Sequence, residues 1–422
     1  MALKTVFKYS MKQVDVKNAF LNGLLKEETF LELPEGVNIN EEQGNCYQLL
    51  KAMNGLKQAA RAWYKKLDEC LTELGFKQSE ADPSLYTSHE RNSMMFVLVY
   101  VDDILFVGSD DNRISQTVQQ LSESFEIRVE DRVEKFLGIL VDCRDNGDVH
   151  LHSSPAVQRI LRQFNFENCR PAATPLPAGT ILSAELCGST DEEREKMSVI
   201  PYRERIGSLI YLANTTRPDI SFSVGMLSRY MENPDMRHWN AACHVLRYLK
   251  ATANTGILYK ANVSSEIHAY SDADFAGDRD SRKSTTGFVF TCASGAVSWR
   301  SKKQSLTAQS TVEVETIALS VSVRELLWMK KILLDFQLPS SYASVVGVDN
   351  QGCISVCKSG ALTDKTKHIS VQLSLIRDHI ENGDITLVYI PTAHMAADMF
   401  TKQLTRVKLL ANLRMIGLIG QE

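Results

Sequence analysis

The sequence predicts a multidomain protein that combines α+β and α/β architecture. Its 422 residues and 44% apolar content are enough for roughly two to four domains, each with its own hydrophobic core. In the N-terminal half, two apolar strand-like runs flank a pair of aspartates. In the C-terminal half, the patterns follow the order strand-strand-strand-helix-strand-helix, which predicts one mixed sheet covered by helices.

Composition narrows the function classes. The formal net charge of −4 argues against a uniformly basic nucleic-acid binder. It does not exclude local basic grooves. Nine scattered cysteines predict reduced thiols inside the cell, and Cys353 and Cys357 lack the further ligands that a zinc site needs. There is no run of 18 apolar residues and no signal-peptide core in residues 1–20, so we expect no membrane association.

The pair Asp102-Asp103 is the strongest chemical signal in the N-terminal half. The apolar runs 94–101 and 104–107 predict a β-hairpin over about 93–108 with these carboxylates at its tip. A hairpin turn needs only Asn-Gly or Asp-Gly, and two adjacent carboxylates repel each other unless a cation neutralises them. Oxygen ligands of this kind select Mg²⁺ or Mn²⁺.

An earlier aspartate has two interpretations. Val14 and Val16 predict a short strand that places Asp15 near its end. Asp15 could equally cap a following helix, as aspartates often do.

A helix is predicted to follow a polar turn in residues 45–76. Trp63 and Tyr64 on this helix are typical of core packing. Lys57 and Arg61 either contact phosphates or are simply solvated surface charges.

The middle of the chain is expected to be mostly helical. We expect a linker or long surface loop over 171–200, because proline, glycine and charged residues accumulate there. The other expected elements are a helix capped by Asp110 or Asp111, a hairpin over 133–152, and helices near 155–165, 201–213, 217–232 and 235–251.

Acidic residues recur near element ends in the C-terminal half. They lie beside predicted strands within 263–290 and 345–348, at the start of a helix running from about 310 to 336, and in an expected final helix. Four converging carboxylates can hold two Mg²⁺ ions about 4 Å apart, whereas each acid alone is equally typical of a solvated cap. The residues are Asp272, Glu315, Asp349 and Asp398.

Several short motifs occur in a fixed order along nearly the whole chain. They are Gln13–Gly23, Leu33–Gly36, Gly55–Tyr64, Tyr100–Asp103, Phe136–Gly138, Gly207–Leu212, Thr216–Asp219, Tyr270–Asp274, Ser284–Gly287, Ser301–Gln304, Lys367–Ile369 and Ala397–Lys402. In this collinear order they resemble the reverse transcriptase and RNase H of copia-type retrotransposons. The Tyr-Val-Asp-Asp motif alone is moderately specific, and the ordered series is much more so.

The resemblance implies a division of the chain into four parts. It implies a ferredoxin-like reverse-transcriptase palm in 1–126, with most of the fingers missing, and a thumb-like region and linker in 127–200. A helical connection in 201–262 and an RNase H-like mixed-sheet domain in 263–422 would follow. Only 14 residues precede Asp15, so we expect the C-terminal part of a polyprotein with Met1 as an internal start.

The resemblance also assigns roles in the palm. Asp15, Asp102 and Asp103 match the metal-binding acids that hold Mg²⁺, with Mn²⁺ as the alternative. Phe20 matches the aromatic ring that excludes ribonucleotides at the sugar 2′ position. Lys57 and Tyr100 are further expected substrate-binding residues.

In the RNase H-like domain, the four-acid set that cleaves the RNA strand of a hybrid is matched by Asp272, Glu315, Asp349 and Asp398. His394 lies roughly where that family carries a mobile histidine, or it is a solvated loop residue. Five positions depart from the family pattern without removing an acid: Asn54, Ala60, Gln309, Thr316 and Met395.

The expected function is therefore RNA-directed DNA polymerase with RNase H activity. The alternatives are a protein that retains only the nuclease and a catalytically dead remnant that binds nucleic acid. Expected partners are an RNA template, a DNA primer, RNA–DNA hybrid and dNTPs, with the integrase and capsid parts of the same element. The expected location is the cytoplasm, in a virus-like particle if the element is intact, with the nucleus as the alternative.

Overall fold

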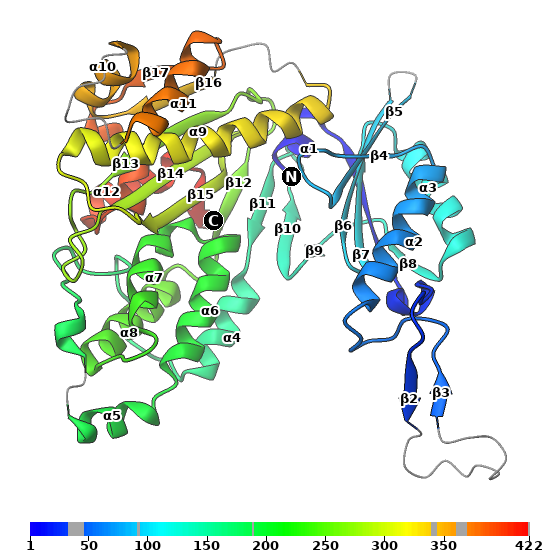
Figure 1. The fold of residues 1–422 in the computed structure, drawn as a ribbon, viewed down its shortest axis with the longest axis horizontal. Helices are drawn as coiled ribbons and strands as arrows, with labels where there is room; N and C mark the ends of the chain where they lie inside the picture. Colours follow the sequence, from blue (N-terminus) through cyan, green and yellow to red (C-terminus); the bar gives the residue numbers. More distant parts are fainter. Residues whose placement is uncertain (33–45, 91–92, 188–189, 339–343, 360–368, 421–422) are drawn as a thin grey trace. The chain divides into compact units, whose positions relative to one another are not determined.

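The computed structural model describes residues 1–32, 46–90, 93–187, 190–338, 344–359 and 369–420. The motifs Leu33–Gly36 and Lys367-His368 lie outside these residues. The described residues form two compact units. The small unit contains Phe7–Leu137 and Lys331–Leu338, and the large unit contains Met1–Val6, Gly138–Lys330 and the described residues after 338 (Figure 1).

The small unit is built on a six-stranded antiparallel sheet in the order β4-β5-β6-β7-β1-β8. Helices α2 (Ala59–Glu73) and α3 (Asp111–Ser124) pack on one face of it, with Trp63, Leu71 and Ile114 in the shared core. The strands are β1 (Ser10–Val16), β4 (Lys77–Gln78), β5 (Leu85–Glu90), β6 (Ser93–Tyr100), β7 (Asp103–Gly108) and β8 (Ile127–Glu130). The shorter elements are η1 (Ala19–Asn22), β2 (Phe30–Glu32), β3 (Cys46–Gln48) and β9 (Lys135–Phe136), while α1 (Ala2–Phe7) belongs to the large unit except for Phe7.

The predicted hairpin is confirmed as β6 and β7, with Tyr100 paired to Asp103. Its turn is therefore Val101-Asp102, and Val101 has φ = 57°, a left-handed conformation that is unusual for a β-branched residue. The indole Nε1 of Trp63 donates a hydrogen bond of 2.7 Å to the Val101 carbonyl. Trp63 is buried, so its predicted role in the core is confirmed and it also supports the strained turn.

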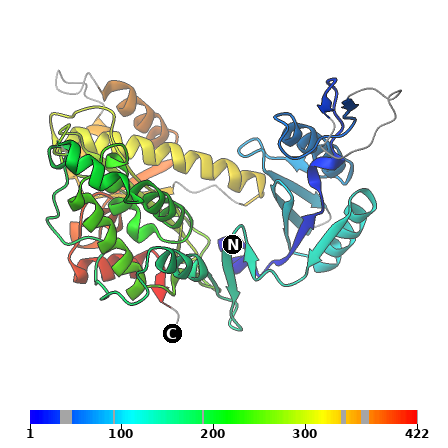
Figure 2. The ribbon, with the colours of Figure 1, turned by 90° about the horizontal axis from the view of Figure 1, so that it is seen from below.

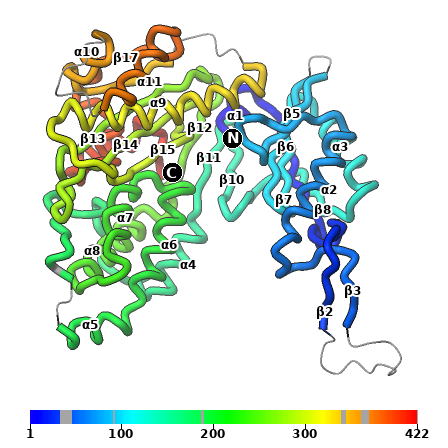
Figure 3. Tube along the Cα trace, viewed as in Figure 1, coloured from blue at the N-terminus to red at the C-terminus, as the bar shows by residue number. Residues whose placement is uncertain are grey.

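The large unit contains the predicted mixed sheet, in the order β15-β14-β13-β16-β17. The first three strands are antiparallel, and β13, β16 and β17 are parallel. Helices α9, α10 and α11 cover one face through Leu319, Cys353 and Leu373 (Figures 2 and 3). The elements are β13 (His268–Ala273), β14 (Thr285–Cys292), β15 (Gly295–Lys303), α9 (Thr311–Asp335), β16 (Ser344–Val348), α10 (Gln351–Ser359), α11 (Ser370–Glu381) and β17 (Ile385–Tyr389).

The opposite face of the mixed sheet meets the helical part of the large unit. Val289 of β14 and Ala296 of β15 join one apolar cluster with helices α6, α7 and α8. Beside them lies a second sheet, in which β18, β12, β11 and β10 pair antiparallel in that order. The elements are β10 (Ile139–Cys143), β11 (Val149–His152), α4 (Ser154–Gln163), η2 (Ala184–Leu186), α5 (Asp191–Ser198), α6 (Tyr202–Thr215), η3 (Pro218–Ile220), α7 (Ser221–Leu227), η4 (Ser228–Tyr230), α8 (Met236–Ala251), β12 (Thr255–Tyr259), η6 (Thr392–His394), η7 (Ala396–Phe400), α12 (Arg406–Met415) and β18 (Leu418–Gly420).

Some expected elements differ in the structure. The segment 171–200 is not entirely loop, because Thr190 and Glu193 form a capping box that starts α5. The expected helix over 217–232 is divided into η3, α7 and η4. Asp398 lies in the 3₁₀ turn η7 and not in a final α-helix, and α12 and β18 follow it.

The fold class is as predicted: a multidomain α+β and α/β protein with a palm-like antiparallel sheet and an RNase H-like mixed sheet. The four-part division at residues 126, 200 and 262 stays a prediction. In the part of the chain that the structure describes, no helix is both long and apolar enough to cross a membrane.

Two candidate active sites

The acids of the large unit meet at one edge of the mixed sheet. Asp272 lies near the end of β13, and Asp349 directly follows β16. These strands are parallel neighbours, so their carboxyl ends reach the same edge. Glu315, near the start of α9, completes a group in which one oxygen from each residue lies within 4.8 Å of the others. The convergence expected for these three side chains is present.

The fourth acid joins this group through a lysine. The Nζ atom of Lys402 lies 2.6 Å from Oδ1 of Asp398 and 3.6 Å from Oδ2 of Asp272. The ammonium of Lys408 contacts the other oxygen of Asp398, and the hydroxyl of Thr401 donates to Asp272. Asp398 is fully buried and is bridged to Asp272 by a positive charge.

Burial and mutual repulsion raise the pKa values of two acids in this cluster. Burial raises the pKa of Asp272 to about 7, against the opposing effect of Lys402. Burial together with the charges of Asp272 and Asp349 raises the pKa of Glu315 to about 10. The Oε2 atom of Glu315 is buried without a hydrogen-bond partner. An all-oxygen donor set with an orphaned carboxylate oxygen fits a divalent cation such as Mg²⁺ or Mn²⁺.

His394 lies close in sequence to this cluster but is exposed. It ends η6, the turn whose Thr392 donates a 2.8 Å hydrogen bond to Asp349. Thr392, Thr401, Lys402 and Lys408 were not identified from the sequence. Lys402 lies four residues after Asp398 within one motif, and that spacing is the signal that could have found it.

Two acids of the small unit, Asp15 and Asp103, share one face of the six-stranded sheet. Asp15 of β1 is the register partner of Asp103 of β7, and Asp102 occupies the adjoining turn. Burial, followed by the charges of Asp102 and Asp15, raises the pKa of Asp103. The side chain of Gln13, which the sequence did not single out, donates a 3.1 Å hydrogen bond to Asp103.

These acids are less tightly gathered than those of the large unit. Among the described residues, Asp15, Asp102 and Asp103 do not form a set whose oxygens all lie within 4.8 Å. The expected strand-end position of Asp15 is present. Asp15 and Asp103 therefore lie side by side with Asp102 in the adjoining turn, in a looser arrangement than the acid cluster of the large unit.

The expected substrate-binding residues lie around this unit. Phe20, in η1, is partly buried against the core, whereas Tyr100 is 60% exposed at the end of β6. Lys57 is exposed in the turn before α2, as either of its two interpretations requires.

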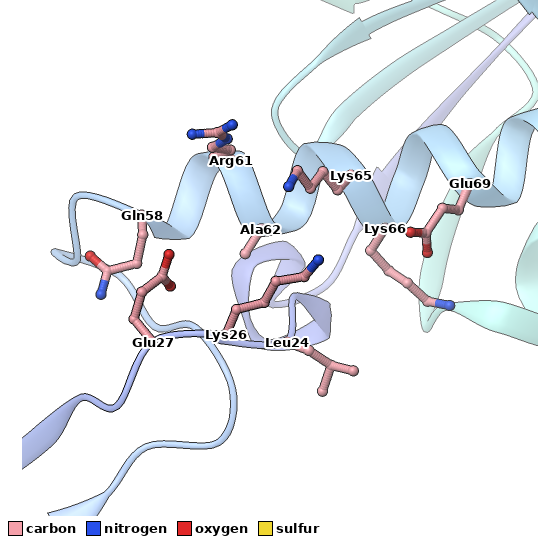
Figure 4. Close-up of a pocket in the computed structure, with 9 residues that line it drawn as sticks. All are labelled: Leu24, Lys26, Glu27, Gln58, Arg61, Ala62, Lys65, Lys66 and Glu69. Atoms are coloured by element: carbon pink, nitrogen blue, oxygen red, sulfur yellow. The ribbon is translucent and has the colours of Figure 1, made fainter.

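A basic pocket of about 300 Å³ opens beside α2. Figure 4 shows side chains of α2 above the segment that follows η1. Its lining residues are Leu24, Lys26, Glu27, Gln58, Arg61, Ala62, Lys65, Lys66 and Glu69. Arg61, for which the sequence leaves a phosphate contact or a solvated charge open, lies on a surface richer in cations than in acids.

Comparisons with known proteins agree with these features. A sequence model of the reverse transcriptase (RNA-dependent DNA polymerase) family matches residues 1–178. The retrovirus-related Pol polyprotein from transposon TNT 1-94 of Nicotiana tabacum is 37% identical over 94% of this chain and 30% of its own length. The corresponding polyprotein from transposon RE2 of Arabidopsis thaliana is 36% identical over 97% of this chain and 28% of its own length.

The chain thus spans under a third of the length of these two relatives. A solved RNase H1 isolated from compost covers 32% of this chain and 93% of its own, with 18% identity and a TM-score of 0.27. Residues 1–178 thus match the reverse transcriptase family, and over nearly its whole length the chain is similar to the retrovirus-related Pol polyproteins of transposons.

Proposed function

We propose that the chain is an RNA-directed DNA polymerase with RNase H activity. The observation that carries the proposal is the convergence of Asp272, Glu315 and Asp349, with Asp398 held beside them by Lys402. The relatives are Pol polyproteins of transposons, which supports a role in copying element RNA into DNA. The nuclease substrate would be the RNA strand of an RNA–DNA hybrid.

In the large unit, the cation-binding residues would be Asp272, Glu315, Asp349 and Asp398. Bound Mg²⁺ or Mn²⁺ would supply activation of a water and neutralisation of charge at the scissile phosphate. The chain itself would orient the site: Thr401 fixes Asp272, Thr392 fixes Asp349, and Lys402 and Lys408 hold Asp398. Burial of Asp272, Glu315 and Asp398 excludes bulk water from these three carboxylates.

In the small unit, Asp15, Asp102 and Asp103 would hold the cations at which a primer 3′-hydroxyl meets a dNTP. Phe20, partly buried in η1, would crowd the sugar 2′ position and exclude ribonucleotides. Tyr100 would contact primer or template from the exposed end of β6, and Lys57 would meet phosphate.

A pair of isosteric variants tests the nuclease assignment. Asp349→Asn removes one carboxylate charge from the large unit, and Asp102→Asn makes the same change in the small unit. We expect Asp349→Asn to reduce Mg²⁺-dependent cleavage of a labelled RNA–DNA hybrid by on the order of 100-fold or more, since even outer residues of metal sites matter by 10–100-fold. Asp102→Asn should leave cleavage near the wild-type rate. If Asp349→Asn cleaves the hybrid as fast as wild-type protein, the nuclease assignment is wrong.

The same two variants test the polymerase assignment, with their expected effects exchanged. We expect wild-type protein to extend an oligo(dT) primer on poly(rA) with Mg²⁺, Asp102→Asn to lose extension, and Asp349→Asn to retain it. An absence of extension by wild-type protein that still cleaves hybrid would exclude the polymerase function.

A nuclease-only function is the second candidate. Its specific support is the looser arrangement of Asp15, Asp102 and Asp103 compared with the acid cluster of the large unit. A catalytically dead protein that binds nucleic acid is excluded by any metal-dependent turnover that Asp272→Asn abolishes. Integrase and capsid partners, and the cytoplasmic or nuclear location, stay predictions.

A further inference from the structure

A second group of metal-type donors lies in the large unit, outside both candidate active sites. It consists of Asp142 on β10 and His150 and His152 on β11, with one ligand atom from each within 4.8 Å of the others. Asp142 is the register partner of His150 across the antiparallel pair. His150 and His152 are two residues apart on one strand, so both rings leave the same face.

Two imidazole nitrogens face one carboxylate oxygen. Nε2 of His152 lies 2.9 Å from Oδ2 of Asp142, and Nδ1 of His150 lies 3.9 Å from the same atom. The rings are nearly parallel, with an interplanar angle of 22° and centroids 5.1 Å apart. The other nitrogen of His152 contacts the hydroxyl of Ser154, which leaves Nε2 for Asp142. These contacts fix which nitrogens point into the group.

His150 is the member that packing alone does not explain. Its side chain is fully buried; the ring faces the backbone of Ile419, and Nδ1 completes no hydrogen bond. The ring lies over Gly256 of β12, where an added Cβ would come within 2.7 Å of Nε2. A buried polar nitrogen without a partner is unfavourable, and Nδ1 is aimed at the carboxylate of Asp142. A cation between the two would give Nδ1 of His150 the partner that it lacks.

The donor chemistry selects the class of cation. Two imidazoles and one carboxylate suit Zn²⁺, Co²⁺ or Ni²⁺ better than Mg²⁺, which prefers oxygen ligands. Tetrahedral bonds of about 2.1 Å place neighbouring ligand atoms roughly 3.4 Å apart. The two measured separations, 2.9 and 3.9 Å, lie on either side of that value. The side chain of Asp142 is 41% exposed, so water has access to the remaining coordination position.

We propose that Asp142, His150 and His152 bind one divalent transition-metal ion of the Zn²⁺ type. The ion would link β10 to β11 and would stabilise this hairpin independently of the acid cluster. The site would be structural, because metal that binds only the folded state shifts the folding equilibrium towards it.

The experiment uses the full chain after treatment with a chelator. Zn²⁺ binding is measured by calorimetry in wild-type protein, in Asp142→Asn and in His152→Gln. The exposed His268→Gln serves as the matched histidine control, and Asp349→Asn serves as the control for metal bound at the acid cluster. Thermal unfolding with and without Zn²⁺ gives a second readout that does not depend on activity.

We expect one Zn²⁺ equivalent that His268→Gln and Asp349→Asn retain and that Asp142→Asn and His152→Gln bind at least about 10-fold more weakly, as loss of a ligand requires. Unchanged Zn²⁺ affinity in both site variants, or loss of the equivalent in Asp349→Asn alone, would overturn the proposal. If both site variants fail to fold, the visible spectrum of wild-type protein with Co²⁺ decides. A tetrahedral band supports the site, and a purely octahedral spectrum rejects it.

Discussion

Lys402 places a fixed positive charge inside the acid cluster of the large unit. Its ammonium lies between Asp398 and Asp272, at 2.6 and 3.6 Å. A divalent cation bridging the same two carboxylates would compete with that ammonium for the same oxygens. The ammonium of Lys402 therefore holds the two carboxylates together. A bound divalent cation would either displace this ammonium or share the carboxylate oxygens with it.

This competition is testable with Lys402→Met, which keeps an apolar stem and removes the charge. At pH 8 we expect Mn²⁺ to bind the acid cluster more tightly, by on the order of 10-fold, which corresponds to about 1.4 kcal/mol. Calorimetric titration of the full chain measures the change. The exposed Lys358→Met on α10 is the control. Weaker Mn²⁺ binding by Lys402→Met would mean that the lysine supports the ionised acids more than it competes with metal.

A buried histidine gives the large unit a dependence of stability on pH. Burial lowers the pKa of His238, against the attraction of Asp235 and Asp280, and Arg237 lowers it slightly further. The ring stacks on Tyr230 with centroids 4.1 Å apart. The neutral form is thus favoured in the folded protein, while the unfolded chain binds the proton with an ordinary pKa of about 6.5. This stabilisation is complete above that value and is lost as pH falls below it.

We expect the midpoint of thermal unfolding of wild-type protein to decline between pH 7.5 and 5.5. His238→Gln should be less stable at pH 7.5 because it loses the stacked ring, yet its decline over the same range should be smaller. Scanning calorimetry at several pH values measures both quantities. The exposed His268→Gln should keep the wild-type slope. Parallel slopes in wild type and His238→Gln would assign the dependence to other groups.

At the scale of elements, the β6–β7 hairpin combines two adjacent acids with a strained turn. Val101 adopts φ = 57° so that Asp102 and Asp103 can follow directly. Such strain costs of order 1–3 kcal/mol for a non-glycine residue. Trp63 offsets part of it by donating to the Val101 carbonyl and by an edge contact with Phe125.

Val101→Asn should relieve this strain, since asparagine tolerates left-handed backbone. Because Val101 is 42% exposed, little apolar burial is lost, and we expect the small unit to gain about 1 kcal/mol. Hydrogen exchange of the β6 and β7 amides at increasing denaturant concentration measures the change in both variants. Trp63→Phe should act in the opposite direction by about 1 kcal/mol, the usual value of one hydrogen bond. A loss of stability in Val101→Asn would show that its side-chain packing outweighs the strain.

Elements with a strong local pattern were predictable from the sequence. The hairpin, α2, α3 and α9 follow from apolar periodicity, and Asp110 caps α3 as expected. The 3₁₀ turn around Asp398 and the short β18 were not predictable. A 3₁₀ turn carries no long periodicity, and β18 exists because its residues pair with β12 far away along the chain.

At the scale of the whole molecule, the fold class and the convergence of three acids in the large unit were predictable. Strand order and parallel pairing place Asp272 and Asp349 at one edge of the sheet. The series of motifs in the sequence can indicate this strand order. The lysine bridge to Asp398 and the group around His150 were not predictable. They depend on side-chain directions across sheets that only the tertiary structure fixes.

The chain contributes to the small unit from two distant segments. Besides Phe7–Leu137, this unit includes Lys331–Leu338, in which Phe336 lies with its ring centroid 4.2 Å from that of Phe96. The carbonyl of Asp335 also lies 2.9 Å from the ring nitrogen of His89. The small unit therefore depends on residues that follow it by almost 200 positions.

Phe336→Ala should destabilise the small unit by roughly 2–3 kcal/mol, less than a fully buried phenylalanine because the ring is only partly buried. Hydrogen exchange of the full chain measures where protection is lost. We expect faster exchange in β5 and β6 and unchanged exchange in β13 and β16. Equal loss of protection in both units would show that they unfold as one cooperative body.

The strained turn and the buried acids also bear on how this sequence changes over generations. Val101 in left-handed backbone and the unpartnered buried Oε2 of Glu315 lower folding stability, so substitutions at these two positions can stabilise the fold. Under the proposed function, related copies that escape selection for chemistry should lose these codons before those of the apolar core. The order in which such copies decay would then record when each proposed activity was last under selection.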